Sequence, residues 1–247
     1  MTRRTPDDQE GTTMHRYAAS GLSSMATRAV LAELAARVSA DGPADLAFAA
    51  AGGVEVARRV REGEAADLLV LASGAVETLV AQGHLVADTV RPLFLSEVVV
   101  GAPQSGPAPE VDSVEQLQAA LAGAGRIGYS TGPSGDAVLR LLDDWGLRAR
   151  LADRLVQAPA GVPVGRMLVE GGADLGFQQR SELTGLRGVR VLGSMPPGAE
   201  ITTTFTGAVL IRAGDEQVAR GLLQALAAPA FSPVVAGHGM RHAPAFT

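Results

Sequence analysis

Residues 58–73, with the sequence RRVREGEAADLLVLAS, decide the fold class. A helical pattern over residues 54–62 is closed by Gly63, because glycine readily takes the left-handed conformation that ends a helix. Asp67 then precedes the continuous apolar run 68–72. Such a run is typical of a strand that is buried on both faces. The stretch therefore predicts a helix that leads back into an inner strand of a sheet.

The same alternation of strands and helices continues on both sides of this stretch. Helical spacing is found over residues 26–38 and 75–82. Ser113 and Gln116 form a capping box, which opens a further helix. By the same reasoning we expect strands over 46–50, 93–100, 126–129, 175–177 and 201–211, and helices over 114–122, 136–145, 166–170 and 216–228.

The alternation predicts an α/β protein of two lobes, each a mainly parallel sheet flanked by helices, with a cleft between the lobes. Three prolines and two glycines in residues 101–109 mark the change of lobe. The last helix has no new strand after it, so it must cover an existing sheet. We therefore expect a disordered leader over residues 1–13, lobe 1 over 14–95 plus 200–247, lobe 2 over 96–199, and connecting strands near 94–101 and 201–211.

Composition excludes several classes of function. The net charge is −5 and the densest basic cluster is residues 58–61, so we expect no nucleic-acid partner. All 21 basic residues are arginine, and the chain contains neither Lys nor Cys, which excludes a lysine Schiff base, a thiolate nucleophile and cysteine metal sites. His238 and His242 have i, i+4 spacing but lie among glycines near the chain end. We expect no metal and no cofactor, and a small molecule as partner.

The first residues give an expectation about location. Residues 1–13 are polar and charged, without the apolar stretch that secretion needs. No apolar run approaches the roughly 20 residues of a membrane span. We therefore expect a cytoplasmic protein without a membrane anchor.

Three parts of the chain resemble the type 2 periplasmic solute-binding protein superfamily, in particular its molybdate-binding-protein-like branch. Residues 58–73 resemble the branch's stretch in which a buried strand delivers a small polar residue to the cleft. Residues 171–177, GGADLGF, resemble the counterpart in its second lobe, and residues 222–240 resemble its final helix and tail. The similarity extends over residues 14–240.

The resemblance implies two lobes joined by two crossover strands, with the ligand held between them. It also implies an ABC permease as partner if the protein is exported, which conflicts with the polar N-terminal residues. The chain is similar as well to an aconitate-isomerase-like offshoot of the superfamily, in which the same fold isomerises aconitate. This second similarity implies an enzyme.

Ligands of open α/β sheets bind at the carboxyl ends of the strands, where helix N-termini present unpaired N–H groups. The first such turn carries Ser23, Ser24 and Thr27, which we expect to contact a ligand. Helix capping is the alternative for any one of these side chains. Gly53 and Ser73 stand at the next two strand ends.

The loop after Tyr129 is the strongest candidate in the second lobe. Residues 129–135, YSTGPSG, lead from a strand through hydroxyls and glycines into a helix, which has the chemistry of an anion-binding nest. Ser130, Thr131 and Ser134 would contact the anion. The alternative is a plain turn that starts the helix.

Three later segments add candidates. A turn rich in glycine and proline ends in Val164 and Arg166, and this arginine either clamps a carboxylate or points to solvent. Gln178 and Gln179 follow a strand and can hydrogen-bond a ligand. Thr204 lies on the second crossover strand, where alternate threonines face the cleft or pack within the sheet.

These candidates predict a site for a small di- or tricarboxylate between the hydroxyl-rich turn of lobe 1 and the loop after Tyr129. Neutral hydroxyls and backbone amides can hold an ionised carboxylate, with Arg28 or Arg166 orienting it. The enzyme hypothesis is a cofactor-free allylic isomerisation in which Tyr129 or Glu182 carries the proton. The alternative is the substrate-binding protein of an ABC transporter, with a molybdate-like oxyanion or a carboxylate as ligand.

Overall fold

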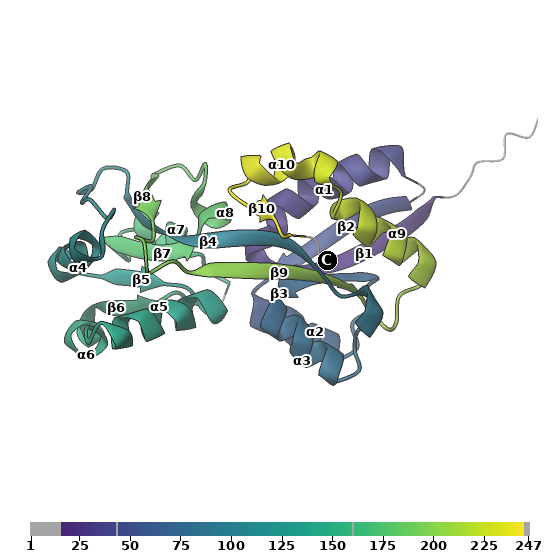
Figure 1. Cartoon of the computed structure of the whole chain (residues 1–247), viewed down its shortest axis with the longest axis horizontal. Helices are drawn as coiled ribbons and strands as arrows, with labels where there is room; N and C mark the ends of the chain where they lie inside the picture. The colour runs from purple at the N-terminus through teal and green to yellow at the C-terminus, as the bar shows by residue number, and fades with distance from the viewer. Residues whose placement is uncertain (1–15, 43, 160, 245–247) are drawn as a thin grey trace, which may run out of the picture.

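The computed structural model describes residues 16–42, 44–159 and 161–244. Helices cover both faces of one curled sheet, and strands β4 and β9 run from one lobe to the other (Figure 1). The predicted α/β fold with two lobes is confirmed. The predicted leader over residues 1–13 lies outside the described residues, and the predicted lobe boundaries stay a prediction.

The first lobe is built from both ends of the described chain. Its strands are β1 (Tyr17–Ser24), β2 (Ala44–Ala51), β3 (Leu68–Ala72), the first half of β4 (Arg91–Pro103), β9 (Thr202–Val209) and β10 (Arg241–His242). Its helices and 3₁₀ turns are η1 (Met25–Thr27), α1 (Arg28–Asp41), α2 (Gly53–Arg61), α3 (Ser73–Ala81), η2 (Ala87–Thr89), α9 (Glu216–Leu226), η4 (Pro229–Phe231) and α10 (Ser232–Gly237).

The second lobe is built from the middle of the chain. Its strands are the second half of β4, β5 (Ile127–Tyr129), β6 (Leu155–Gln157), β7 (Leu175–Gln179) and β8 (Val189–Ser194). Its helices and turns are α4 (Val114–Gly123), α5 (Pro133–Asp144), α6 (Arg148–Leu151), η3 (Ala152–Arg154), α7 (Val164–Val169) and α8 (Arg180–Leu183). The capping box of α4 is confirmed, because the Ser113 hydroxyl accepts from the Gln116 N–H at 3.2 Å.

The sheet has the order β2-β1-β3-β9-β4-β7-β5-β6 and is mixed. Strand β1 runs parallel to β2 and β3, and β5 runs parallel to β6 and β7. Strand β9 runs antiparallel to β3, and β4 runs antiparallel to β7, β8, β9 and β10. The predicted parallel arrangement therefore describes the outer strands of each lobe, whereas the two long central strands run against their neighbours.

Strand β4 changes its partner in the middle. Its residues from Arg91 to Glu97 pair with β9, and those from Val98 to Gly101 pair with β7. The two lobes are thus joined by one continuous strand and by β9 beside it. The connecting strands expected near 94–101 and 201–211 correspond to β4 and β9.

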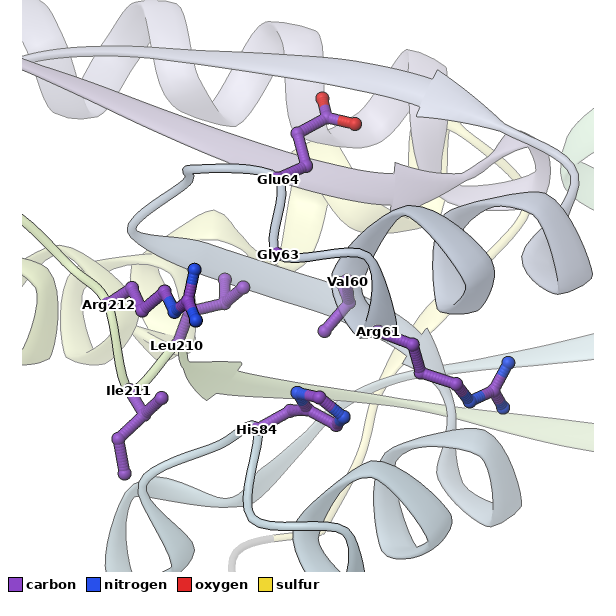
Figure 2. A pocket seen from close by; sticks show the side chains of 8 residues that line it. All are labelled: Val60, Arg61, Gly63, Glu64, His84, Leu210, Ile211 and Arg212. Atoms are coloured by element: carbon purple, nitrogen blue, oxygen red, sulfur yellow. The ribbon is translucent and has the colours of Figure 1, made fainter.

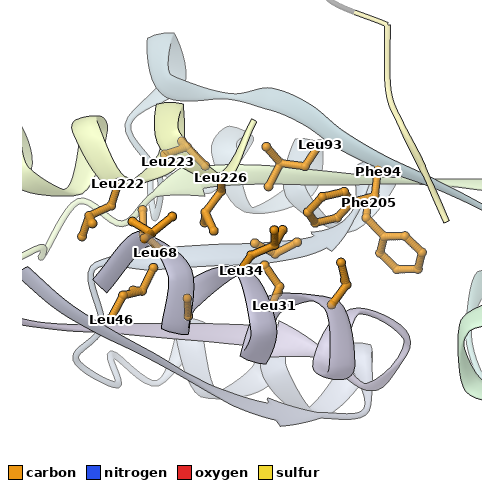
Figure 3. Packing of buried hydrophobic residues seen from close by; sticks show 14 of the residues in the cluster. Leu31, Leu34, Leu46, Leu68, Leu93, Phe94, Phe205, Leu222, Leu223 and Leu226 are labelled. Atoms are coloured by element: carbon orange, nitrogen blue, oxygen red, sulfur yellow. The ribbon is translucent and has the colours of Figure 1, made fainter. Parts of the chain in front are cut away.

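The largest core lies on one face of the first lobe's sheet. Leu31 and Leu34 of α1 pack into one cluster with Leu222 of α9 and with Phe94 and Phe205 of the two crossover strands (Figure 3). A second cluster fills the opposite face beneath α2 and α3. Because both faces are covered, the run 68–72 is fully apolar, as the sequence predicts.

Asp67, just before β3, ties three segments of the first lobe together. Its carboxylate accepts hydrogen bonds from the Tyr17 hydroxyl at 2.7 Å, the Ser20 N–H at 2.8 Å and the Gly214 N–H at 2.9 Å. The residue is only 4% exposed, and the hydrogen bond raises the pKa of the Tyr17 phenol. One side chain therefore fixes β1, the start of β3 and the loop before α9.

Two strands extend further than predicted. Ser23 and Ser24, expected in a turn, are the last residues of β1, and Gln178 and Gln179, expected after a strand, are the last residues of β7. In both places the backbone continues its ladder with a neighbouring strand, as in the pairing of Ser23 with Val70. This pairing outweighs the local preference of serine for turns.

Within the part of the chain that the structure describes, no single helix has the length and apolar composition needed to cross a membrane. The pair Glu216–Leu226 and Pro229–Gly237 meets that measure only when both helices are counted together across a 48° bend.

We predict that Asp67→Ala lowers the free energy of unfolding by about 3 kcal/mol, because three hydrogen bonds to a buried carboxylate are lost. Urea denaturation at pH 7 measures this loss. Asp45→Ala is the control, since that carboxylate is largely exposed and should contribute under about 1 kcal/mol. Equal effects of the two substitutions would contradict the role given to Asp67.

Candidate functional site

The two lobes meet where β1 and β7 end. The turn η1, which follows Ser24, lies against α8, which follows Gln179. We call residues 23–27 and 178–183 together the lobe junction. Both parts of it come from carboxyl ends of parallel strands, which is where ligands of α/β sheets bind.

The lobe 1 side of the junction is hydroxyl-rich and buried. Ser23 is 0% exposed, and its hydroxyl has no hydrogen-bond partner among the described residues. The Ser24 hydroxyl lies 3.3 Å from that of Thr27, which donates to the Ser24 carbonyl at 3.1 Å. Arg28 follows on the first turn of α1 and is exposed. The structure therefore groups the three predicted hydroxyls in one place.

The other lobe 1 candidates occupy helix starts. Gly53 begins α2, and a Cβ there would meet nothing within 4 Å, so space alone does not require glycine. Ser73 begins α3, with its hydroxyl 2.7 Å from the Thr206 hydroxyl and 3.2 Å from the Thr204 carbonyl oxygen. Ser73 and Thr204 therefore connect α3 to β9 within lobe 1.

The loop after Tyr129 has its own internal geometry. The Ser130 and Ser134 hydroxyls lie 2.9 Å apart, whereas Thr131 is exposed. A Cβ on Gly135 would lie 1.8 Å from the Ser130 carbonyl oxygen, so only glycine allows α5 to approach this loop. Tyr129 is half-buried at the end of β5.

The structure does not bring the side chains of Val164 and Arg166 into this group. Val164 is fully buried in the core beneath α7, which leaves only its backbone for a ligand. Arg166 is 62% exposed, and its guanidinium pairs with Glu170 at 2.7 Å, one helical turn away. In this structure Arg166 therefore points to solvent, which is the alternative that the sequence left open, and its contact with a carboxylate ligand stays a prediction.

The two glutamines at the end of β7 are buried and point to different neighbours. The Gln178 amide oxygen accepts a hydrogen bond from the Gly165 N–H at 2.9 Å, at the start of α7. The Gln179 amide nitrogen lies 2.6 Å from the Thr203 hydroxyl of β9, while its amide oxygen has no partner among the described residues. Gln179 thus connects β7 of one lobe to a strand of the other.

Glu182 is the ionisable group of α8 whose chemistry differs most from its ordinary behaviour. Burial raises its pKa from the ordinary 4.5 to about 7, and the neighbouring Gln178 amide only partly opposes this shift. A carboxyl group that titrates near neutral pH can both accept and donate a proton there. The lobe junction therefore combines hydroxyl and amide groups, the Arg180 guanidinium that pairs with Glu97, and one carboxyl group suited to proton transfer.

The sequence interpretation missed three residues of this region. Ser96 of β4, Ser181 of α8 and Thr203 of β9 carry hydroxyls at or beside the junction, and those of Ser96 and Ser181 are buried without a partner among the described residues. Ser96 carries a detectable signal, because Ser96 and Glu97 together interrupt the apolar run of residues 93–100. Its position opposite Thr203 depends on a pairing between distant segments.

Two cavities lie away from the junction. A small one of about 40 Å³ is lined by Arg61, His84 and Arg212 near the end of α2, with the Glu64 carboxylate directed away from Arg212 and His84 (Figure 2). A groove of about 590 Å³ lies between α1 and α9, with Phe231 at one end. In the described ranges, no three His, Asp or Glu side chains are placed to hold a metal ion.

Comparison with known proteins agrees with this architecture. The family described as bacterial extracellular solute-binding protein matches residues 21–241. Among curated proteins, an aconitate isomerase from Pseudomonas sp. is 30% identical over 174 residues, which are 69% of this chain and 65% of that protein. The aligned part is thus slightly less than two thirds of the relative's length.

Solved structures share the fold. The periplasmic molybdate-binding protein of Azotobacter vinelandii superimposes with a TM-score of 0.77 at 18% identity, over 90% of this chain and 98% of that one. The substrate-binding domain of a putative molybdenum ABC transporter from Clostridium difficile gives 0.70 at 16% identity, over 92% and 100%.

We predict that Glu182→Gln raises the melting temperature at pH 8 and changes it little at pH 5. Because the folded pKa lies near 7 and the ordinary one near 4.5, folding favours the protonated acid, and stability falls as pH rises through this window. At pH 8 the wild-type protein buries an ionised group that glutamine lacks. The exposed Glu77→Gln serves as control, and an equal effect of Glu182→Gln at both pH values would contradict the assignment.

Proposed function

This chain belongs to the bacterial extracellular solute-binding protein family, and on that premise we propose that it binds a small di- or tricarboxylate at the lobe junction and isomerises it without a cofactor. The reaction is an allylic proton transfer of the aconitate-isomerase type. The observation that carries this proposal is Glu182, a carboxyl group with a pKa of about 7, on a helix that faces the hydroxyl-rich turn of the other lobe. The relative from Pseudomonas supports the choice of reaction.

Binding uses the uncharged groups of the junction. The Ser24 and Thr27 hydroxyls can donate to carboxylate oxygens when they exchange their present contacts for the ligand, and the region excludes water because both sides are largely buried. The Gln178 amide, fixed by the Gly165 N–H, holds the neighbourhood of Glu182 in place. Arg28 is the cation at the rim that can draw in an anionic substrate.

Proton transfer uses Glu182 as a single base and acid. Its carboxylate takes a proton from the methylene carbon beside the substrate double bond, and the C–H electron pair spreads over the allyl system and its carboxylate. The double bond moves by one carbon, and Glu182 returns the proton to the former vinyl carbon. Neither oxidant nor co-reactant is consumed, and the hydroxyl donors stabilise the enolate-like charge that develops.

We predict that the wild-type protein interconverts cis- and trans-aconitate in deuterated water. Deuterium should enter the carbon that becomes the product's methylene group, and the vinyl position after repeated turnover, as followed by proton NMR. Glu182→Gln should lower the exchange rate about 10²- to 10⁴-fold, whereas Glu77→Gln should match the wild type. Tyr129→Phe tests the second proton carrier that the sequence suggests. Tight binding of aconitate without interconversion or deuterium uptake would refute the isomerase proposal.

The pH dependence gives a separate prediction. The base form of Glu182 is required, so kcat/KM should rise with pH and level off above about 7, following the pKa of the free protein. Steady-state rates between pH 5 and 9 measure this profile. A profile that is flat through this range, or that falls as pH rises from 5 to 7, would exclude Glu182 as the base.

The second candidate function is the substrate-binding protein of an ABC transporter, favoured by the fold shared with periplasmic molybdate-binding proteins. In that case the same junction would hold an oxyanion or a carboxylate and pass it to a permease. A thermal shift with molybdate, but none with carboxylates, together with absent proton exchange, distinguishes this function from the isomerase. A cytoplasmic location stays a prediction, and cell fractionation tests it.

A further inference from the structure

We propose that Ser96, on crossover strand β4, contacts the bound acid, and that with the Gln179 amide it forms an uncharged subsite for one carboxylate of the ligand. The proposal rests on the proposed function, because it assigns a new part of the same site. Ser96 lies outside the turns from which the sequence candidates come.

The first observation is the distribution of buried polar atoms without partners. In residues 16–42, 44–159 and 161–244, six such side-chain atoms occur. Three of them lie at the end of β7, at the start of α8 and on the part of β4 beside them, namely Gln179 Oε1, Ser181 Oγ and Ser96 Oγ. Native proteins satisfy nearly all buried polar groups, so this group of three indicates a place where a polar ligand or ordered water binds.

The second observation places Ser96 beside Gln179. Ser96 is the partner of Thr203 across the β4–β9 pair, and Val98 is the partner of Gln179 across the β4–β7 pair. Side chains alternate along a strand, so positions 96 and 98 share one face of the sheet with their partners. The contact of 2.6 Å between Gln179 Nε2 and Thr203 Oγ1 agrees with this placement.

The third observation concerns the chemistry that this pair offers. The Ser96 hydroxyl can donate to a carboxylate oxygen. The Gln179 amide can do the same after rotation of its last bond, since the Thr203 hydroxyl can then donate to the amide oxygen. Two neutral donors on adjacent strands suit a carboxylate, and they need no buried cation.

Ser96 also lowers the stability of the ligand-free protein. It is 1% exposed and shares one face of β4 with the apolar residues Phe94 and Val98. A buried hydroxyl without a partner destabilises a protein relative to a methyl group of similar size. Such a residue is characteristic of a binding site, where side chains that bind a ligand often make the ligand-free fold less stable.

Ser96 lies at the place where strand β4 passes from one lobe to the other. Strand β4 changes partner between Glu97 and Val98, and it runs through both lobes (Figure 1). A ligand that bonds Ser96 and Gln179 therefore touches β4 and β7 at the place where the two halves of the sheet join.

The test uses tricarballylate, a saturated tricarboxylate that cannot isomerise, so binding is measured apart from turnover. For Ser96→Ala we expect a dissociation constant about tenfold weaker by calorimetry, as for loss of one hydrogen bond. The melting temperature of the free variant should equal or exceed that of the wild type. Thr89→Val is the matched control, because this buried hydroxyl is satisfied by the Val86 carbonyl and the Val209 N–H; it should melt lower and bind normally.

An Ser96→Ala protein that melts lower and binds tricarballylate as tightly as the wild type would overturn the inference, because the hydroxyl would then be structural. Binding unchanged by Ser96→Ala, with aconitate exchange intact in the wild type, would overturn the inference alone. Failure of the wild-type protein to bind tricarballylate and to exchange aconitate protons would contradict the proposed function and this subsite together.

Discussion

Strand β4 exchanges its partner between Glu97 and Val98, pairing with β9 before that point and with β7 after it. Because one strand serves both lobes, the backbone ladder continues through the junction and both lobes cover its side chains. Water is therefore a poor partner for polar groups there, and each of them needs another protein group or a ligand. The concentration of unpartnered hydroxyl and amide atoms beside this point follows from that constraint.

Local pattern was sufficient to predict the elements that carry their own signal. The run 68–72 after Asp67, the helix end at Gly63 and the capping box at Ser113 depend on neighbours in sequence, and the structure confirms them. The mixed direction of the sheet depends on pairing between β4 and β9, which are far apart along the chain. The ends of β1 and β7 were placed too early because their serines and glutamines resemble turn residues, although strand partners keep them extended.

In the candidate site, too, residues marked by local sequence could be predicted, whereas residues placed by tertiary pairing could not. Hydroxyls near strand ends, such as Ser24 and Thr27, could be named from sequence because helix starts follow parallel strands in α/β folds. The sequence could not show whether Arg166 faces a ligand or solvent, and the structure places it at the surface in an ion pair with Glu170. Ser96 escaped the prediction because its partner strand is set by tertiary pairing. The pKa of Glu182 depends on burial in the folded protein, and no local pattern reports that.

A crystal structure with tricarballylate bound tests the central claim, that the ligand site lies at the lobe junction with Glu182 as its proton carrier. The account predicts the tricarboxylate between η1 and α8, with its methylene carbon in contact with the Glu182 carboxylate and one terminal carboxylate on Ser96 and Gln179. Density for the ligand in the groove between α1 and α9, or at the junction with Glu182 out of reach of every ligand carbon, would contradict it.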